Sequence, residues 1–252
     1  MLHETAAPAG GGGGQEARRE REAHERTTLR TGAVCAVLGA VVSVAAGAGF
    51  ADRTPTWDPV RLLTYLTAQP GWYWPTVHLG FILGALLWVG AFAAIADTLP
   101  GGLARTLGRL ATASVTVGAA IHAVDSLVDG FGLAALARMW ASAAGAEREG
   151  LLRDAVVLQQ VLHGTWAGVA MLFHGLPFVL LGAAVVATRR VPAWFGGTGS
   201  VAGAVAFVAG VLMFLGLDLL PQAAFIDSAV AVSLWMVVLG VLLGRRAAVV
   251  VQ

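Results

Sequence analysis

The chain has 252 residues, of which 57% are hydrophobic and only 12% charged, and its formal net charge is +1. Soluble domains carry about 25% charged residues, so this composition excludes an ordinary soluble domain and predicts an all-α, polytopic membrane protein. A charge this close to zero also excludes the basic surface that a nucleic-acid partner requires. The single cysteine, Cys35, excludes a disulfide within the chain and argues against a cysteine metal site.

Residues 1–28 are predicted to be a disordered segment outside the membrane. They contain five consecutive glycines at 10–14 and a mixed-charge stretch at 15–22, which bury too little apolar surface to offset the ordering entropy. Glu and Arg pairs three or four residues apart would favour a short surface helix in the charged part. The remaining residues, 29–252, are predicted to form one six-span transmembrane domain.

Six apolar stretches follow, each with at least the roughly 20 residues that cross a bilayer. We place them at residues 31–50, 75–99, 103–127, 157–188, 196–220 and 224–244. The third helix has a sequence that allows it to continue towards Met139, and residues 141–154 are expected to form a loop or a surface helix. The fourth stretch is longer than one span needs, so it tilts or projects from the hydrocarbon. The pattern predicts a six-helix transmembrane bundle.

The arginines indicate how the bundle is oriented. They cluster before the first stretch, between the second and third, after the fourth and after the sixth, close to the ends of the spans. The other loops are longer and carry fewer arginines. The positive-inside rule therefore predicts a multi-pass protein of the cell membrane with both termini in the cytoplasm.

Most acidic and histidine residues of the apolar stretches lie at the opposite, extracytoplasmic end. Seven of them come from five stretches: His78, His122, Asp125, Asp129, His163, Asp218 and Asp227. Ionisable side chains are costly inside a membrane, so a convergent group is a functional-site hypothesis. We expect His78, His122, Asp125, His163 and Asp227 to lie at similar depth with their side chains towards the interior of the bundle.

The strongest local pattern is on the third stretch. His122, Asp125, Ser126 and Asp129 share an arc of roughly 100° on one helix, so one face presents an imidazole and two carboxylates. This set suits a divalent metal, a proton relay or an acid–base pair. We take Asp125, His122 and Asp227 as candidate catalytic residues.

Several ionisable residues of the spans also have a structural explanation. Asp129 lies where the helix leaves the membrane, and His163 and Asp227 lie near an interface, where water solvates them. His174 lies near mid-membrane beside Pro177, and we interpret it as a core histidine bonded to a neighbouring helix. The candidate ligands of a divalent metal are His78, His122 and His163.

Four functions remain open on these residues. The first is a membrane-embedded enzyme, metal-dependent or acid–base, acting on a lipid-like substrate that arrives through the bilayer. The second is a haem-binding electron-transfer protein with two of His78, His122 and His163 as axial ligands. The third is a proton-coupled transporter, although the inner half has few ionisable residues for a path. The fourth is a non-catalytic membrane subunit.

The second half of the chain carries a loose family signature. It consists of Arg-Val-Pro-Ala-Trp-Phe-Gly-Gly-Thr-Gly at residues 190–199, a final span with Ser233 and Trp235, and a Gly-Arg-Arg exit at 244–246. On these residues, the last two-thirds of the chain resembles a group of bacterial six-span integral membrane proteins of unknown function. The resemblance implies an all-helical membrane fold and no established activity.

Overall fold

The computed structural model describes residues 12–51, 58–189, 192–217 and 222–249, and every regular element in these ranges is helical. Six of the helical segments are long and apolar enough to cross a bilayer, which confirms the predicted all-α bundle and a multi-pass membrane protein. In chain order the elements are α1 (Gly12–Ala51), α2 (Pro59–Ala68), α3 (Tyr73–Thr98), α4 (Leu103–Leu127), the π-helical turn η1 (Val128–Leu133), α5 (Ala134–Ser142), α6 (Gly145–Val169), the π-helical turn η2 (Ala170–Gly175), α7 (Leu176–Thr188), α8 (Ala193–Phe214) and α9 (Gln222–Val249).

The first helix begins earlier than the sequence predicts. α1 continues without a break from Gly12, so the boundary expected at residue 28 falls inside a helix rather than at the end of a disordered segment. An ion pair one turn apart, Arg18 Nε to Glu22 Oε1 at 2.8 Å, supports these exposed turns. Arg246 of α9 also reaches Glu25 at 2.8 Å and ties the projecting helix to the bundle. Residues 1–11 lie outside the described ranges, and the two-part division of the chain stays a prediction.

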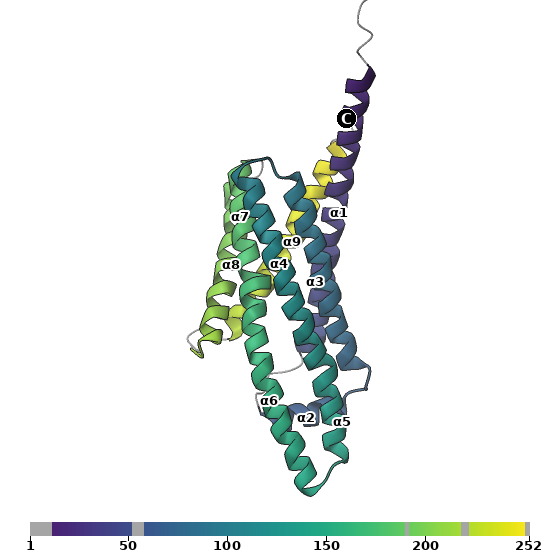
Figure 1. The fold of residues 1–252 in the computed structure, drawn as a ribbon, viewed down its shortest axis with the longest axis vertical. Helices are drawn as coiled ribbons and strands as arrows, with labels where there is room; N and C mark the ends of the chain where they lie inside the picture. The colour runs from purple at the N-terminus through teal and green to yellow at the C-terminus, as the bar shows by residue number, and fades with distance from the viewer. Residues whose placement is uncertain (1–11, 52–57, 190–191, 218–221, 250–252) are drawn as a thin grey trace, which may run out of the picture.

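Two of the membrane helices are much longer than a bilayer requires. The segments Leu103–Ser142 and Gly145–Thr188 have 40 and 44 residues, which at 1.5 Å per residue is about 60 and 66 Å, against a hydrocarbon core of about 30 Å. Their far halves form a hairpin that projects from the bundle beside α2 (Figure 1). The third helix thus continues past Met139 as expected, and only residues 143–144 break the helices within the predicted loop.

The projecting hairpin has a small core of its own. Side chains of α2, α5 and α6 gather around Trp74 at the start of α3, and Leu63, Leu133 and Trp140 are among those that are buried. Asp58 is the N-cap of α2, and its carboxylate accepts hydrogen bonds from the backbone amides of Val60 and Arg61. This packing fixes the first turn of α3, and His78 lies one turn farther along that helix.

Small residues allow the membrane helices to approach closely. A Cβ atom added at Gly84 of α3 would collide with Ser43 of α1, and one added at Gly118 of α4 would fall on the backbone of Leu172 in η2. Such contacts replace the hydrophobic effect as the cohesive force between helices in lipid. The second contact matters for the site, because it sets α4 directly against η2.

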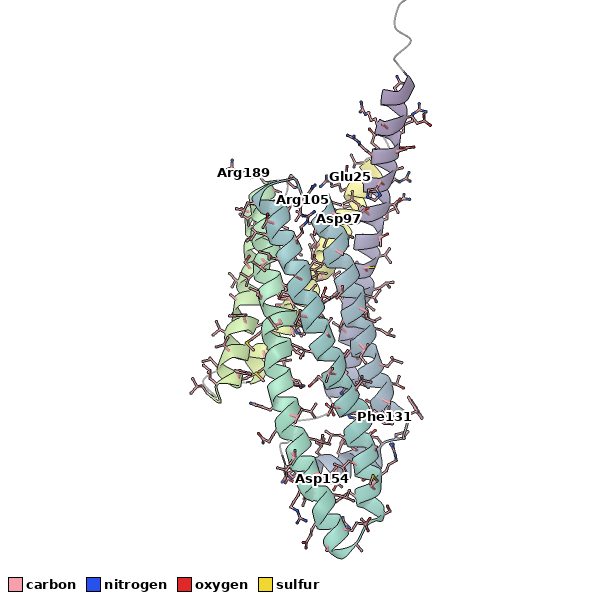
Figure 2. The ribbon with its side chains drawn as sticks, in the orientation of Figure 1. Glu25, Asp97, Arg105, Phe131, Asp154 and Arg189 are labelled. Atoms are coloured by element: carbon pink, nitrogen blue, oxygen red, sulfur yellow. The ribbon has the colours of Figure 1, made fainter. Side chains whose placement is uncertain are left out.

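Charged side chains mark the two ends of the bundle. Arg105 and Arg189 lie at the same end as Glu25 and Asp97, and Phe131 and Asp154 lie towards the other end (Figure 2). Asp97 is exposed. The geometry therefore separates an arginine-bearing end from the end that carries the predicted cluster.

A candidate intramembrane site

A cavity of about 460 Å³ lies in the half of the bundle remote from the arginine-bearing end. It is lined by α1, α3, α4, η1, α6, η2 and α9, so it gathers side chains from most of the bundle. Its walls are mainly apolar, and several are rings: Phe81, Trp166, Phe173 and Phe225. The polar residues that line it include His78, His122, Asp125, Ser126, Asp129 and His174.

Asp129 and His78 form a buried pair at one side of the cavity. Nε2 of His78 lies 3.2 Å from Oδ2 of Asp129. The indole Nε1 of Trp74 donates to the backbone oxygen of Asp129 at 2.9 Å and to its Oδ1 at 3.1 Å. Nδ1 of His78 lies 3.0 Å from the carbonyl oxygen of Trp74. Each polar atom of the pair thus has a partner, which is what a buried ion pair requires.

The turn η1 brings this pair together. A π-turn closes its hydrogen bonds five residues apart instead of four, and it rotates the residues within it off the regular helical face. Gly130 is also needed, because a Cβ atom at this position would collide with the His78 side chain. Asp129 is therefore not at a wet rim, as one interpretation of the sequence had it, but is buried against α3.

The number of protons on the pair follows from its partners. The carbonyl of Trp74 can only accept, so Nδ1 of His78 carries a hydrogen. Nε2 then faces a carboxylate oxygen, and one further proton lies between them, on the imidazole or on the carboxyl group. The pair is satisfied in either form. It is therefore suited to hold the geometry of the site rather than to contact a ligand.

Asp125 is in a different situation. It is 4% exposed, and the Thr165 hydroxyl of α6 donates a hydrogen bond to its Oδ1. Within the described part of the chain, no arginine or histidine nitrogen lies within 4.0 Å of this carboxylate. A buried carboxylate without a cationic partner is expensive unless it is protonated or a ligand compensates it. Asp125 lines the cavity and can supply either a proton or a negative charge there.

Three further polar atoms at the cavity have no hydrogen-bond partner among the described residues. They are Nδ1 of His122, Nδ1 of His174 and Oγ of Ser126. Ser126 is only 2% exposed, so bulk water does not satisfy it. Orphaned buried donors and acceptors cost about 1–3 kcal/mol each, and they are rare outside functional sites.

The histidines are embedded in a series of aromatic contacts. The ring of His122 lies between Phe81 and Phe173, with centroids 5.6 and 5.3 Å away, and the His174 ring is 6.5 Å from His122. His174 stands in η2, just before Pro177, and also contacts Phe225 at 5.6 Å. The prediction that His174 bonds to a neighbouring helix is wrong for Nδ1, and the residue is instead part of the cavity wall.

The cavity reaches the bundle surface between α1 and α9. These helices are closely packed near the arginine-bearing end, where a Cβ atom at Gly240 would collide with Val37. Farther along, Val44 of α1 and Val230 of α9 line the cavity although they are 52% and 49% exposed. α9 crosses from α1 at one end to α8 at the other, which opens this space (Figure 1). In a membrane, lipid chains cover such a surface.

The opposite wall closes the cavity. The side chains between His174 and the arginine-bearing end include the fully buried Trp88, Phe92 and Phe178. In the described ranges, the ionisable residues that are buried are His78, Asp125 and Asp129, all on the cavity side. Among the residues that the structure describes, no buried ionisable side chain continues from the cavity through the arginine half.

The predicted site is assembled only in part. His78, His122 and Asp125 line one cavity, whereas His163 does not line it and Asp227 is exposed on α9. Asp218 falls outside the described residues. No group of three His, Cys, Asp or Glu side chains in the described part is placed to hold a metal ion, so His78, His122 and His163 do not form the expected metal set. Sequence reasoning missed the pairing of Asp129 with Trp74 and His78, although the spacing of four between the last two was a signal.

His78 and His122 also do not fit a haem as a pair of axial ligands. Two axial histidines must face each other across the porphyrin with only iron between them. The Phe81 ring contacts both His78 and His122, with centroids at 5.9 and 5.6 Å, and occupies that space.

Comparison of the chain with protein-family models, with curated proteins and with solved structures returns no match. The resemblance to the six-span bacterial group therefore stays a prediction, and the functional argument depends on the geometry of the cavity.

Proposed function

We propose that this membrane protein takes a lipid-like small molecule from the bilayer into the cavity and acts on its polar group by acid–base chemistry. One observation carries the proposal: an apolar cavity opens towards the lipid between α1 and α9 and has unsatisfied polar atoms inside. Binding sites for small molecules are mostly apolar, with a few convergent polar groups that fix orientation. An apolar molecule dissolved in the membrane reaches this mouth without crossing water.

The acid–base roles fall to Asp125 and His122. They are one turn apart on α4, and both face the cavity with hydrogen-bonding capacity to spare. A general acid or base must reach the reacting group of the substrate, and Asp125 lines the cavity while Thr165 and Trp166 hydrogen-bond to its carboxyl group and hold it in place. The satisfied His78–Asp129 pair acts by positioning α4 against α3. This assignment needs no metal, because the chemistry is a proton transfer between the two side chains and the ligand.

The alternative of a subunit without a site accounts less well for the cavity. A purely structural bundle would fill this space with apolar side chains, because orphaned polar atoms destabilise a membrane core. The transporter alternative is weakened by the apolar wall of Trp88, Phe92 and Phe178.

Filling the mouth of the cavity tests the binding step. Gly47 of α1 lines the cavity, and a Cβ atom there would meet nothing within 4 Å, so Gly47→Phe places a ring in the mouth without a clash at Cβ. The matched control is Gly164→Phe on α6, where a Cβ atom also meets open space but the residue does not line the cavity. Native mass spectrometry with dodecanol should show one bound molecule on the unaltered chain and the control, and at least tenfold weaker binding to Gly47→Phe. Equal binding to all three would overturn the proposal.

The acid–base step is tested in membranes. Lipid profiles of cells that make the unaltered chain should differ from those of cells that make Asp125→Asn at the same level. Identical profiles would refute the catalytic part and leave the binding part standing.

We also propose that the arginine-bearing end lies in the cytoplasm of a cell membrane, which puts the cavity in the outer half. In a Cys35→Ala background, a cysteine at Gly145 should react with an impermeant reagent from outside, and one at Gly12 should not. Labelling of both positions from the same side would contradict this topology.

A further inference from the structure

The charge balance of the cavity indicates what kind of ligand it accepts. Two carboxylates line it, and none of the described arginines does. The Asp129 carboxylate is matched by His78 at 3.2 Å, whereas Asp125 has no cationic nitrogen within 4.0 Å among the described residues. When Asp125 is ionised, its negative charge has no cationic partner among the described residues, in a site with mainly apolar walls.

The aromatic walls of the cavity are also suited to a cation. Phe81, Phe173 and Phe225 line the same cavity as Asp125, together with the indole of Trp166. The faces of aromatic rings attract ammonium groups, and the attraction strengthens when water is excluded. A carboxylate beside several rings is the combination that binds substituted ammonium ions.

A separate observation is a buried polar atom without a partner in the cavity wall. Ser126 is 2% exposed, lines the cavity one residue after Asp125, and its hydroxyl has no partner in the described part of the chain. A ligand that carries an N–H or hydroxyl group near Asp125 would satisfy both residues. The orphaned Nδ1 of His122 lies on the same helix and lines the same cavity.

We infer that the ligand is a hydrophobic cation: an amphiphile with a substituted ammonium group that pairs with Asp125 among the aromatic rings, and an apolar chain that extends towards the mouth between α1 and α9. This inference rests on the proposed function and names the chemical class of its ligand. The exposed side chains of Val44, Ile226 and Val230 at the mouth would contact the apolar chain.

The test compares two probes with the same chain, dodecyldimethylammonium (the protonated tertiary amine, which carries one N–H) and dodecanol, on the purified full-length protein in maltoside micelles. The cation should bind at least tenfold more tightly than the alcohol, and Asp125→Asn should reduce this ratio to below threefold. The matched control is Asp227→Asn, an exposed carboxylate on α9 that does not line the cavity and should leave the ratio unchanged. The comparison on the unaltered protein remains decisive even if Asp125→Asn fails to fold.

The outcomes separate the inference from the proposed function. If the two probes bind with equal affinity and Gly47→Phe binds neither, the inference of a cationic ligand is overturned, and the proposed lipid-binding cavity is left standing. An equal fall of the ratio in Asp125→Asn and Asp227→Asn also overturns the inference, because it shows a general effect of charge. If Gly47→Phe binds both probes as the unaltered protein does, the proposed function fails and the inference fails with it.

Discussion

Removal of the Asp129 side chain should destabilise the protein strongly. Asp129→Ala leaves the His78 imidazole without its partner at 3.2 Å and removes one of the two acceptors of the Trp74 indole. The other acceptor is the backbone oxygen of residue 129, which stays. Breaking a buried ion pair from one side costs about 3–5 kcal/mol. At about 2–4 °C per kcal/mol for a protein of this size, Tm should fall by roughly 6–20 °C.

The assay is thermal unfolding of the purified protein in detergent, followed by the loss of monodisperse protein after heating. Asp129→Asn should cost less than Asp129→Ala, because the amide keeps an acceptor for Trp74. Asp125→Asn is the contrasting variant, and its Tm should stay equal or rise, because it removes a buried charge that has no cationic partner. In a double-mutant cycle, His78→Ala combined with Asp129→Ala should cost at least 1 kcal/mol less than the sum of the single changes, as expected of directly coupled residues at about 0.5–3 kcal/mol. A Tm within about 1 °C of the unaltered protein for Asp129→Ala would refute this account of the pair.

Three further changes have defined expectations. Gly118→Ala should lower the free energy of unfolding by about 1–3 kcal/mol in the same assay, because its methyl group meets backbone that cannot move aside. The control Gly164→Ala places its methyl group in open space and should not destabilise the protein. Equal Tm values for the two variants would contradict the close contact at Gly118. Ser126→Ala should leave Tm unchanged or raise it, because it removes an orphaned hydroxyl, and a fall of 1 kcal/mol or more would show a missed partner. Glu25→Ala should cost under about 1 kcal/mol, because its ion pair with Arg246 is partly exposed, and a larger loss would mean that this contact holds α1 and α9 together.

The membrane helices were predictable because length and apolarity are local properties of the sequence. The start of α1 was not, because its exposed turns depend on ion pairs whose net effect is small, including one to α9 far along the chain. For the hairpin that projects beyond the membrane, the sequence predicted helical segments but not where they end. Its position follows from packing against α2, which no local pattern specifies.

The sequence predicted the site residues correctly where a regular α-helix determines the direction of the side chains. His122 and Asp125 share one arc of α4, and both line the cavity. The depth of a residue in the membrane does not determine which way its side chain points, and for this reason the prediction for Asp227 failed. Its neighbour Ile226 lines the cavity, and the rotation of about 100° between consecutive helical residues turns Asp227 outwards.

The two π-turns explain the other differences. Eleven residues separate His163 from His174, which on a regular helix would give them the same face. The turn η2 interrupts that regularity, and only His174 lines the cavity. In the same way η1 buries Asp129 against His78. Neither turn has a sequence signature that distinguishes it from an α-helix.

Photolabelling would test the central claim most directly. A dodecyl ammonium probe with a diazirine in its chain, activated in the membrane and mapped by peptide mass spectrometry, should attach to α1 near residues 43–48 and to α9 near residues 225–233. An excess of unlabelled probe and Gly47→Phe should each suppress this labelling. Labelling spread evenly over outward residues such as Leu83 and Leu86 of α3, without competition, would contradict a lipid-facing binding cavity.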